Sequence, residues 1–171
     1  TGTIMTYGYD PQISSWSPFH GAIYAVVQSL AKVVAIGGDY RKVRLTLQEY
    51  FEKPGKNPDK WGKPFAALLG AFHVQDILNI PAIGGKDSMS GTFKDMTVPP
   101  TLVSFAVCPY DVRNTVSAEF KKSGSKVLFF RLRRNAEEIP DFEQLERMYA
   151  QIQDMIRSGK VLSASTIGTG G

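Results

Sequence analysis

An apolar segment with a clear helix start and stop, set between two segments of strand period, most constrains the fold. Ser17 and Pro18 form a typical N-cap and first helical position, and Gly37-Gly38 supplies the stop. Between them, apolar residues recur at the spacing of one helix face, namely Ile23, Val26, Val27, Leu30, Val33 and Val34. Residues 3–9 before this segment and 42–51 after it alternate with period two. A helix between two strands predicts a mixed α/β fold, with helices packed on one face of a mixed sheet.

The rest of the chain continues this mixture. After a loop over 52–60, we expect a helix that begins at Pro64 and carries an apolar face of Phe65, Leu68, Leu69, Phe72 and Ile77. Further strands are predicted over 80–83, 101–107, 126–132 and 160–164. A last helix begins at Asp141, where Gln144 makes a capping-box-like pair, and ends at Gly159.

The end of the chain indicates a piece of a longer protein. A last strand that runs into Gly170-Gly171 is poorly closed. We therefore expect one nearly complete domain over 1–124 and the beginning of a second, truncated domain over 125–171.

A glycine-rich polar segment follows the predicted strand at 80–83. It combines two glycines, an ammonium, a carboxylate and two hydroxyls, in Gly84, Gly85, Lys86, Asp87, Ser88 and Ser90. Glycines let backbone N–H groups converge, and a fixed ammonium with hydroxyl donors completes a pocket for a phosphate or an oxyanion. The alternative is an ordinary polar hairpin turn, because Gly and Ser clusters are common in turns.

Composition narrows the class of partner. The net charge of +4 comes from 20 basic and 16 acidic residues that are scattered along the chain, so we expect no nucleic-acid binding. No apolar stretch approaches the roughly 20 residues of a membrane span, and the N-terminus has no secretory signal, so we expect no membrane. Cys108 is the single cysteine, which fits a reducing cytoplasm and a small core residue.

Six segments resemble phosphoribosylformylglycinamidine synthase, in its long single-chain form and in the second of its two synthetase-like halves. They are 17–22, 26–32, 44–51, 61–64, 84–93 and 98–105, which include Trp61-Gly62-Lys63-Pro64, Lys86-Asp87-Ser88-Met89-Ser90 and Val98-Pro99-Pro100-Thr101-Leu102-Val103. The resemblance spans nearly the whole chain.

The resemblance implies a purine-pathway ligase of the cytoplasm that uses ATP and Mg²⁺. Formylglycinamide ribonucleotide, a small-molecule nucleotide, is activated by phosphorylation and amidated with ammonia from glutamine. Such chemistry needs cations and backbone donors around the phosphoryl oxygens, and a dry path for ammonia. It also implies the aminoimidazole ribonucleotide synthetase-like fold. The partners would be the other half of the same enzyme and its glutaminase domain, and the fragment, inactive alone, could form a homodimer.

Site residues follow from the same resemblance. Lys86 stands where shorter relatives place an Asn metal ligand, and its ammonium is a hypothetical substitute for part of the ion's charge at a phosphate, which makes it the candidate catalytic residue. Substrate contacts are assigned to Ser88, Asp87 and Ser90, and nucleotide contacts to Gly84, Gly85, Gln48 and Arg44. Glu49 is a further, weaker candidate.

Roles outside binding and catalysis remain alternatives for these residues. Asp87 could orient Lys86 or accept a substrate hydroxyl, but it could equally stabilise a turn. Gln48, Arg44 and Glu49 could serve in cross-strand pairing or face solvent.

Because of two departures from the family pattern, we expect an auxiliary metal-nucleotide site of the family to be absent or altered in this chain. Some long members hold a non-catalytic ADP with magnesium through a Glu and an Asn on the first helix, where this chain has Gln28 and Lys32. An amide and an ammonium are poor magnesium ligands. The later Asp-containing glycine motif is replaced by 166–171, which has no carboxylate. We expect no metal site in this chain.

No glutaminase activity is expected, because Cys108 has no partner for nucleophilic chemistry. The two histidines, His20 and His73, are not expected to act as a general base. Two other interpretations remain. The half could be a non-catalytic scaffold that stabilises the pseudo-dimer, or the chain could be a related kinase or synthetase with the same domain, such as the thiamine phosphate or selenophosphate enzymes. The last does not account for 61–64 and 98–105.

Overall fold

The chain forms one main sheet with helices on one of its faces. In this computed structural model, which describes residues 1–168, the four-stranded sheet has the order β1-β6-β2-β3. Its strands are β1 (Gly2–Gly8), β2 (Arg44–Tyr50), β3 (Ala82–Lys86) and β6 (Thr101–Tyr110). Strand β6 is antiparallel to β1 and β2, whereas β3 is parallel to β2. The predicted mixed sheet is confirmed.

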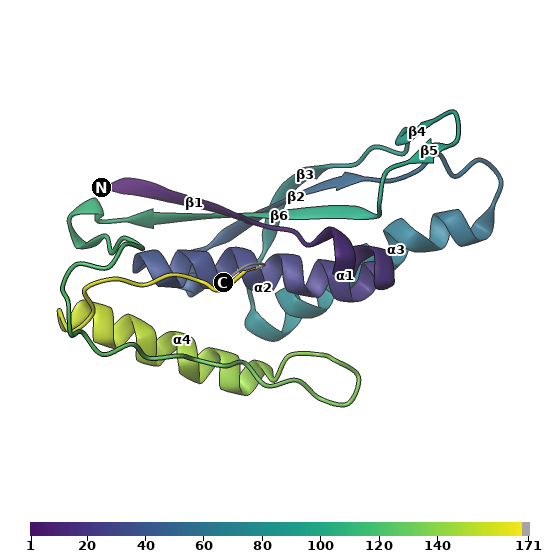
Figure 1. Cartoon of the computed structure of the whole chain (residues 1–171). Helices are drawn as coiled ribbons and strands as arrows, with labels where there is room; N and C mark the ends of the chain where they lie inside the picture. The colour runs from purple at the N-terminus through teal and green to yellow at the C-terminus, as the bar shows by residue number, and fades with distance from the viewer. Residues whose placement is uncertain (169–171) are drawn as a thin grey trace.

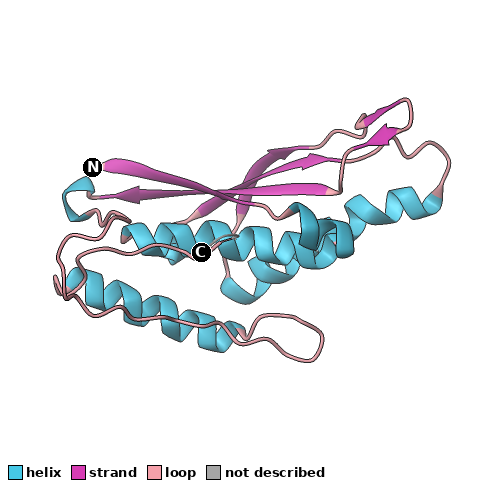
Figure 2. Ribbon diagram, in the orientation of Figure 1, coloured by secondary structure: helices cyan, strands magenta, loops and turns pink. Residues whose placement is uncertain are grey.

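The helices form two further layers. Helices α1 (Pro11–Trp16), α2 (Pro18–Ile36) and α3 (Pro58–Leu78) lie under the sheet, and α4 (Phe142–Arg157) packs on the side of α2 that faces away from the sheet (Figures 1 and 2). No described element covers the opposite face of the sheet. The small elements are the turns η1 (Tyr40–Lys42) and η2 (Val112–Asn114) and the hairpin of β4 (Thr92–Phe93) and β5 (Met96–Thr97).

Helix α2 matches its prediction at both ends. Ser17 Oγ accepts a hydrogen bond from the His20 N–H, and Gly37 ends the helix with a φ of 110°. Contrary to expectation, α2 has the length and composition of a membrane span, with a mean hydropathy of 1.5. Its apolar character has another cause, because 61% of that window is buried in the protein.

Helix α3 differs from its prediction in both start and buried face. It begins at Pro58 with Asn57 as N-cap, so Pro64 lies inside the helix and not at its start. The predicted apolar face is exposed, and the buried residues are Pro64, Ala67, Gly70, Ala71, Val74 and Leu78. The reason is close packing: a Cβ at Gly70 would collide with the Phe19 carbonyl of α2. Small residues therefore face α2, and the large ones are displaced outward.

The predicted strands at 126–132 and 160–164 are absent from the described structure, and their residues are mostly exposed. A strand needs a neighbouring strand for its backbone groups, and none of the described strands pairs with either segment. The capping-box prediction is half right. Asp141 accepts the Gln144 N–H, but the Gln144 side chain binds the backbone of Arg131 and Arg133. The predicted boundary between 1–124 and 125–171 stays a prediction.

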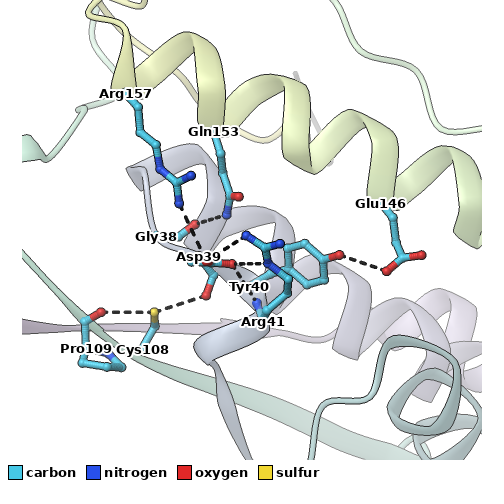
Figure 3. Close-up of polar contacts among 9 residues, drawn as sticks. All are labelled: Gly38, Asp39, Tyr40, Arg41, Cys108, Pro109, Glu146, Gln153 and Arg157. Carbon is cyan, nitrogen blue, oxygen red and sulfur yellow. Dashed lines mark hydrogen bonds and ion pairs between the residues drawn. The ribbon is translucent and has the colours of Figure 1, made fainter.

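Helix α4 is attached to the rest of the chain by buried polar contacts as well as apolar ones (Figure 3). Gln153 Nε2 donates to Gly38 O at 2.7 Å, and Tyr149 Oη donates to Val27 O at 3.2 Å. Tyr40 Oη donates to the Glu146 carboxylate at 3.0 Å, and burial together with this bond raises the pKa of Tyr40 to about 12. Tyr40 is therefore a stable proton donor at neutral pH.

Candidate functional site

The parallel pair of β2 and β3 brings two predicted site residues together. In its register, Gln48 lies opposite Lys86 near the carboxyl ends of both strands. Gly84 and Gly85 belong to strand β3 itself, so the prediction of a loop or turn beginning at Gly84 is wrong. Neither glycine has a positive φ. Their conformation is ordinary extended backbone.

The two glycines differ in their surroundings. A Cβ added at Gly85 would lie 2.5 Å from Leu47 O, whereas one added at Gly84 would meet no atom within 4 Å. Gly85 is thus required by the close approach of β3 to β2. The register shift between Leu45 and Thr46 leaves Ile83 exposed at the same edge.

Beyond β3, the polar segment turns back along the extension of β2. Ser88 N–H donates to Glu49 O at 3.1 Å, and Phe51 N–H donates to Ser88 O at 2.9 Å. Gly91 N–H then donates to Phe51 O at 2.9 Å. Residues 88–91 are therefore held to 49–51 by their backbones, and the hairpin of β4 and β5 follows.

The polar side chains of this segment remain accessible. Lys86 and Asp87 are exposed, and Lys86 Nζ makes one long hydrogen bond, 3.3 Å, to Asp87 O. The hydroxyls of Ser88 and Ser90 bond each other at 2.9 Å. The exposed ammonium is suitable for contact with a phosphate, and the two hydroxyls follow it in the same segment.

Arg44 is not brought to this segment. It lies at the other end of β2, four residues before Gln48, or about 13 Å along a strand. Its guanidinium donates to Val43 O.

Glu49 differs from its neighbours because its carboxyl is buried. The residue is 4% exposed, and its Oε1 has no hydrogen-bond partner among residues 1–168. Burial, followed by the negative charge of Asp87, raises the pKa of Glu49 to about 7. Alternation in 42–51 placed Glu49 on the same face as Val43 and Leu45, which was the available signal for its burial.

Sequence reasoning missed a second cluster around Glu52. Its carboxylate binds Lys60 at 2.8 Å and also binds Lys63, and their hydrogen bonds lower the pKa of Glu52. Lys63 and Glu52 line an open cavity of about 260 Å³ together with Phe51 and residues 97–100. The sequence signal for this cluster was Lys63 in the 61–64 segment. The Lys63 ammonium is already paired with the Glu52 carboxylate.

Magnesium does not fit the described residues. They contain no group of three or more His, Cys, Asp or Glu placed to hold a metal ion. At the auxiliary position, Lys32 Nζ donates to Tyr7 O at 2.7 Å and Gln28 Oε1 accepts from Tyr9 N–H at 3.2 Å. Both side chains support the end of β1. Of the motif at 166–171, residues 169–171 lie outside the described part.

The contacts of the two histidines and the cysteine indicate structural roles. The His20 ring bonds Ser17 Oγ at 2.9 Å and Glu137 O at 2.8 Å. His73 packs between the rings of Phe19 and Phe142. Cys108 is buried in the core as predicted, and burial raises the pKa of its thiol.

Comparison with solved structures identifies the fold. Phosphoribosylformylglycinamidine synthase II from Thermotoga maritima aligns with 92% of this chain at a TM-score of 0.67 and 16% identity. The same protein, PurL, complexed with AMPPCP gives a TM-score of 0.70, and its complex with FGAR gives 0.67, each at 16% identity. The chain spans about a quarter of the length of these structures, 24% of the first. No family model and no curated protein matches the sequence. The chain thus has the aminoimidazole ribonucleotide synthetase-like fold, as predicted.

Proposed function

We propose that this chain is part of a long, single-chain phosphoribosylformylglycinamidine synthase, from the second of its synthetase-like halves. The whole enzyme would be a carbon–nitrogen ligase of purine biosynthesis in the cytoplasm. It would amidate formylglycinamide ribonucleotide with ATP and glutamine-derived ammonia. The fold, which PurL complexes with ATP, AMPPCP and FGAR share, supports this proposal.

The observation that carries the proposal is the pairing of Gln48 with Lys86 at the carboxyl ends of two parallel strands, directly before Ser88 and Ser90. Ligands of open α/β sheets bind at such strand ends. In this proposal, the Lys86 ammonium exchanges its long bond to Asp87 O for an anionic phosphoryl oxygen.

The other proposed contacts follow from position. Ser88, Ser90 and Asp87 would contact the substrate, while Gln48, Gly84 and Gly85 would contact the nucleotide. Arg44 belongs to the proposed set only if a bound nucleotide extends along β2.

The proposed partner is the other half of the same enzyme. The uncovered face of the sheet presents large apolar side chains, with Met5 72% and Tyr7 59% exposed, and Ile83 at the β3 edge is 69% exposed. Such a face indicates a protein interface. A second copy of this chain is the alternative occupant. Because buried Cys108 is the single cysteine, ammonia would come from a separate glutaminase domain.

The test uses the full-length protein, assayed with ammonia in place of glutamine. Lys86→Ala should reduce turnover at least tenfold, because a charge that contacts the transferring phosphoryl group is lost. Ser88→Ala should raise the KM for the nucleotide substrate. Lys56→Ala is the matched control, since Lys56 is an exposed lysine of the 52–57 loop.

A scaffold function is the second candidate, and one observation favours it. No residue of 84–90 lines the cavity at Glu52 and Lys63, and none lines a second cavity at the end of α4, which is formed by Gln151, Asp154, Met155, Ser158 and Lys160. If Lys86→Ala and Ser88→Ala both keep normal turnover, the scaffold interpretation replaces the catalytic one.

A further inference from the structure

The Glu49 carboxyl is an isolated acid in the interior of the domain. Glu49 is the last residue but one of β2 and pairs with Leu102 of β6. It is 4% exposed, and its Oε1 has no hydrogen-bond partner among the described residues. A buried carboxylate with no partner costs several kcal/mol. The neutral, protonated form is therefore the one that fits this position.

No cation compensates the charge of an ionised Glu49. The charged group that acts on it is Asp87, which is negative and lies in the segment after β3. Lys86, beside Asp87, directs its ammonium to the Asp87 carbonyl. Strand β6, on the other side of β2, has no Asp, Glu, Lys, Arg or His in Thr101–Tyr110.

The helices under the sheet do not supply a counter-ion either: α1 has no titratable side chain, and α2 and α3 offer no free cation. Their titratable groups, besides Tyr24, are His20, Lys32, Asp59, Lys60, Lys63, His73 and Asp76. The ammonium groups of Lys60 and Lys63 bind Glu52, and that of Lys32 binds Tyr7 O.

The main chain of Glu49 is part of the attachment of the polar segment. Its carbonyl accepts the Ser88 N–H at 3.1 Å, and the next two contacts, Phe51 N–H to Ser88 O and Gly91 N–H to Phe51 O, are both 2.9 Å. Asp87 is thus held beside Glu49 only while this segment stays paired with 49–51. Separation of the segment would remove the repulsion and admit water to the carboxyl.

We propose that Glu49 is a proton-linked latch on residues 86–91. While Glu49 carries a proton, the segment is seated against the end of β2, and when Glu49 ionises beside Asp87 the segment loosens. The latch itself is a property of the fold. Its use as a regulator of ligand binding rests on the proposed function, because residues 86–90 carry the proposed contacts.

The direction of the pH effect follows from the two states of the segment. With the segment seated, the pKa of Glu49 is about 7, against an ordinary value of 4.5 for a solvated Glu. Because the pKa of Glu49 is higher in the seated state than in solvent, the seated state is favoured fully below pH 4.5. As the pH rises from 4.5 to about 7, the equilibrium constant for the seated state falls by up to roughly tenfold for each pH unit. Above about pH 7 this constant no longer changes.

Hydrogen–deuterium exchange of the whole chain tests the latch without any ligand. Protection of the Ser88 and Gly91 amides, corrected for intrinsic exchange, should fall between pH 5 and pH 7 and then level off. Glu49→Gln should keep the segment protected at every pH. Asp87→Asn should make the fall smaller and let it level off at a lower pH, because the negative charge that helps to raise the pKa of Glu49 is gone, and Asp95→Asn in the exposed hairpin turn is the control.

The results separate the latch from the proposed function. If Glu49→Gln shows the same pH profile as the wild type, or if Asp87→Asn and Asp95→Asn behave alike, the latch is refuted even when Lys86→Ala impairs turnover. If instead the latch is observed while Lys86→Ala is fully active, the latch stands and the proposed catalysis fails. Should Glu49→Gln not fold, the smaller fall expected in Asp87→Asn still decides.

Discussion

Adjacent glycines in β3 should respond oppositely to the same substitution. A Cβ at Gly85 would sit 2.5 Å from Leu47 O, so Gly85→Ala must push β3 away from β2, and overpacking of this kind costs about 1–3 kcal/mol. At Gly84 the added methyl group meets nothing within 4 Å, and the less flexible unfolded chain stabilises the fold by about 0.4–1 kcal/mol. Because the unfolded-state gain is common to both variants, they should differ by the clash alone, about 2 kcal/mol.

Urea denaturation of wild type, Gly84→Ala and Gly85→Ala measures this difference directly, and circular dichroism checks that all three fold. A gap of about 2 kcal/mol corresponds to roughly 4–8 °C in melting temperature for a chain of this size. Equal stability of the two alanine variants would refute the reasoning. It would mean that β3 does not approach β2 at Gly85, and the pairing of Gln48 with Lys86 would lose its support.

Two further predictions concern the far side of α2. Gln153→Ala should lower the free energy of unfolding by about 1–3 kcal/mol, because it leaves the buried Gly38 carbonyl without its donor. Gln151→Ala, on the exposed side of α4, should have little effect. Similar urea midpoints for both variants would contradict this prediction. Asp39→Asn should destabilise the fold at pH 7. Burial tends to raise the pKa of Asp39, but hydrogen bonds from Arg41 outweigh it and lower the pKa, so the carboxylate's contribution is present above pH 3.8 and fades below it. Thermal melts should therefore differ at pH 7 and converge as the pH falls below 3.8, and a gap independent of pH would refute the ionic explanation.

The parts of the fold that local chemistry determines were predictable. The caps at Ser17 and Gly37 fix α2, and the alternation over 42–51 correctly separates buried Val43 and Leu45 from exposed Arg44. These signals concern neighbours in the chain, which a single sequence displays.

The errors arise where contacts between segments that are distant in the sequence determine the structure. The buried face of α3 depends on how closely Gly70 approaches α2, so the large apolar residues that dominate its pattern point outward. The segment 126–132 has strand composition, but composition provides no neighbouring strand. Helix α3 begins at Pro58 with Asn57 as its N-cap, whereas the sequence pattern predicts a loop over 52–60 and a helix start at Pro64.

The same distinction applies to the candidate site. Sequence named Gln48 and Lys86 individually, but their adjacency depends on the register of β2 against β3, which is a tertiary property. Gly85 was expected to provide a flexible turn, and its actual role is to leave room for the Leu47 carbonyl. The burial of Glu49 followed the strand period, whereas its lack of a partner could not be read from the chain.

The contacts that attach α4 have a consequence for divergence. Tyr149 and Gln153 both donate to main-chain carbonyls, those of Val27 and Gly38. Every amino acid supplies such an acceptor, so the bonds themselves place no demand on the side chains at 27 and 38, while the donors have few acceptable replacements. Selection through these bonds should therefore act on α4 alone, whereas packing restricts the acceptor positions: Val27 is buried, and a Cβ at Gly38 would lie 2.6 Å from Val33 Cγ1. A fold held in this way can keep its architecture long after most of its residues have changed.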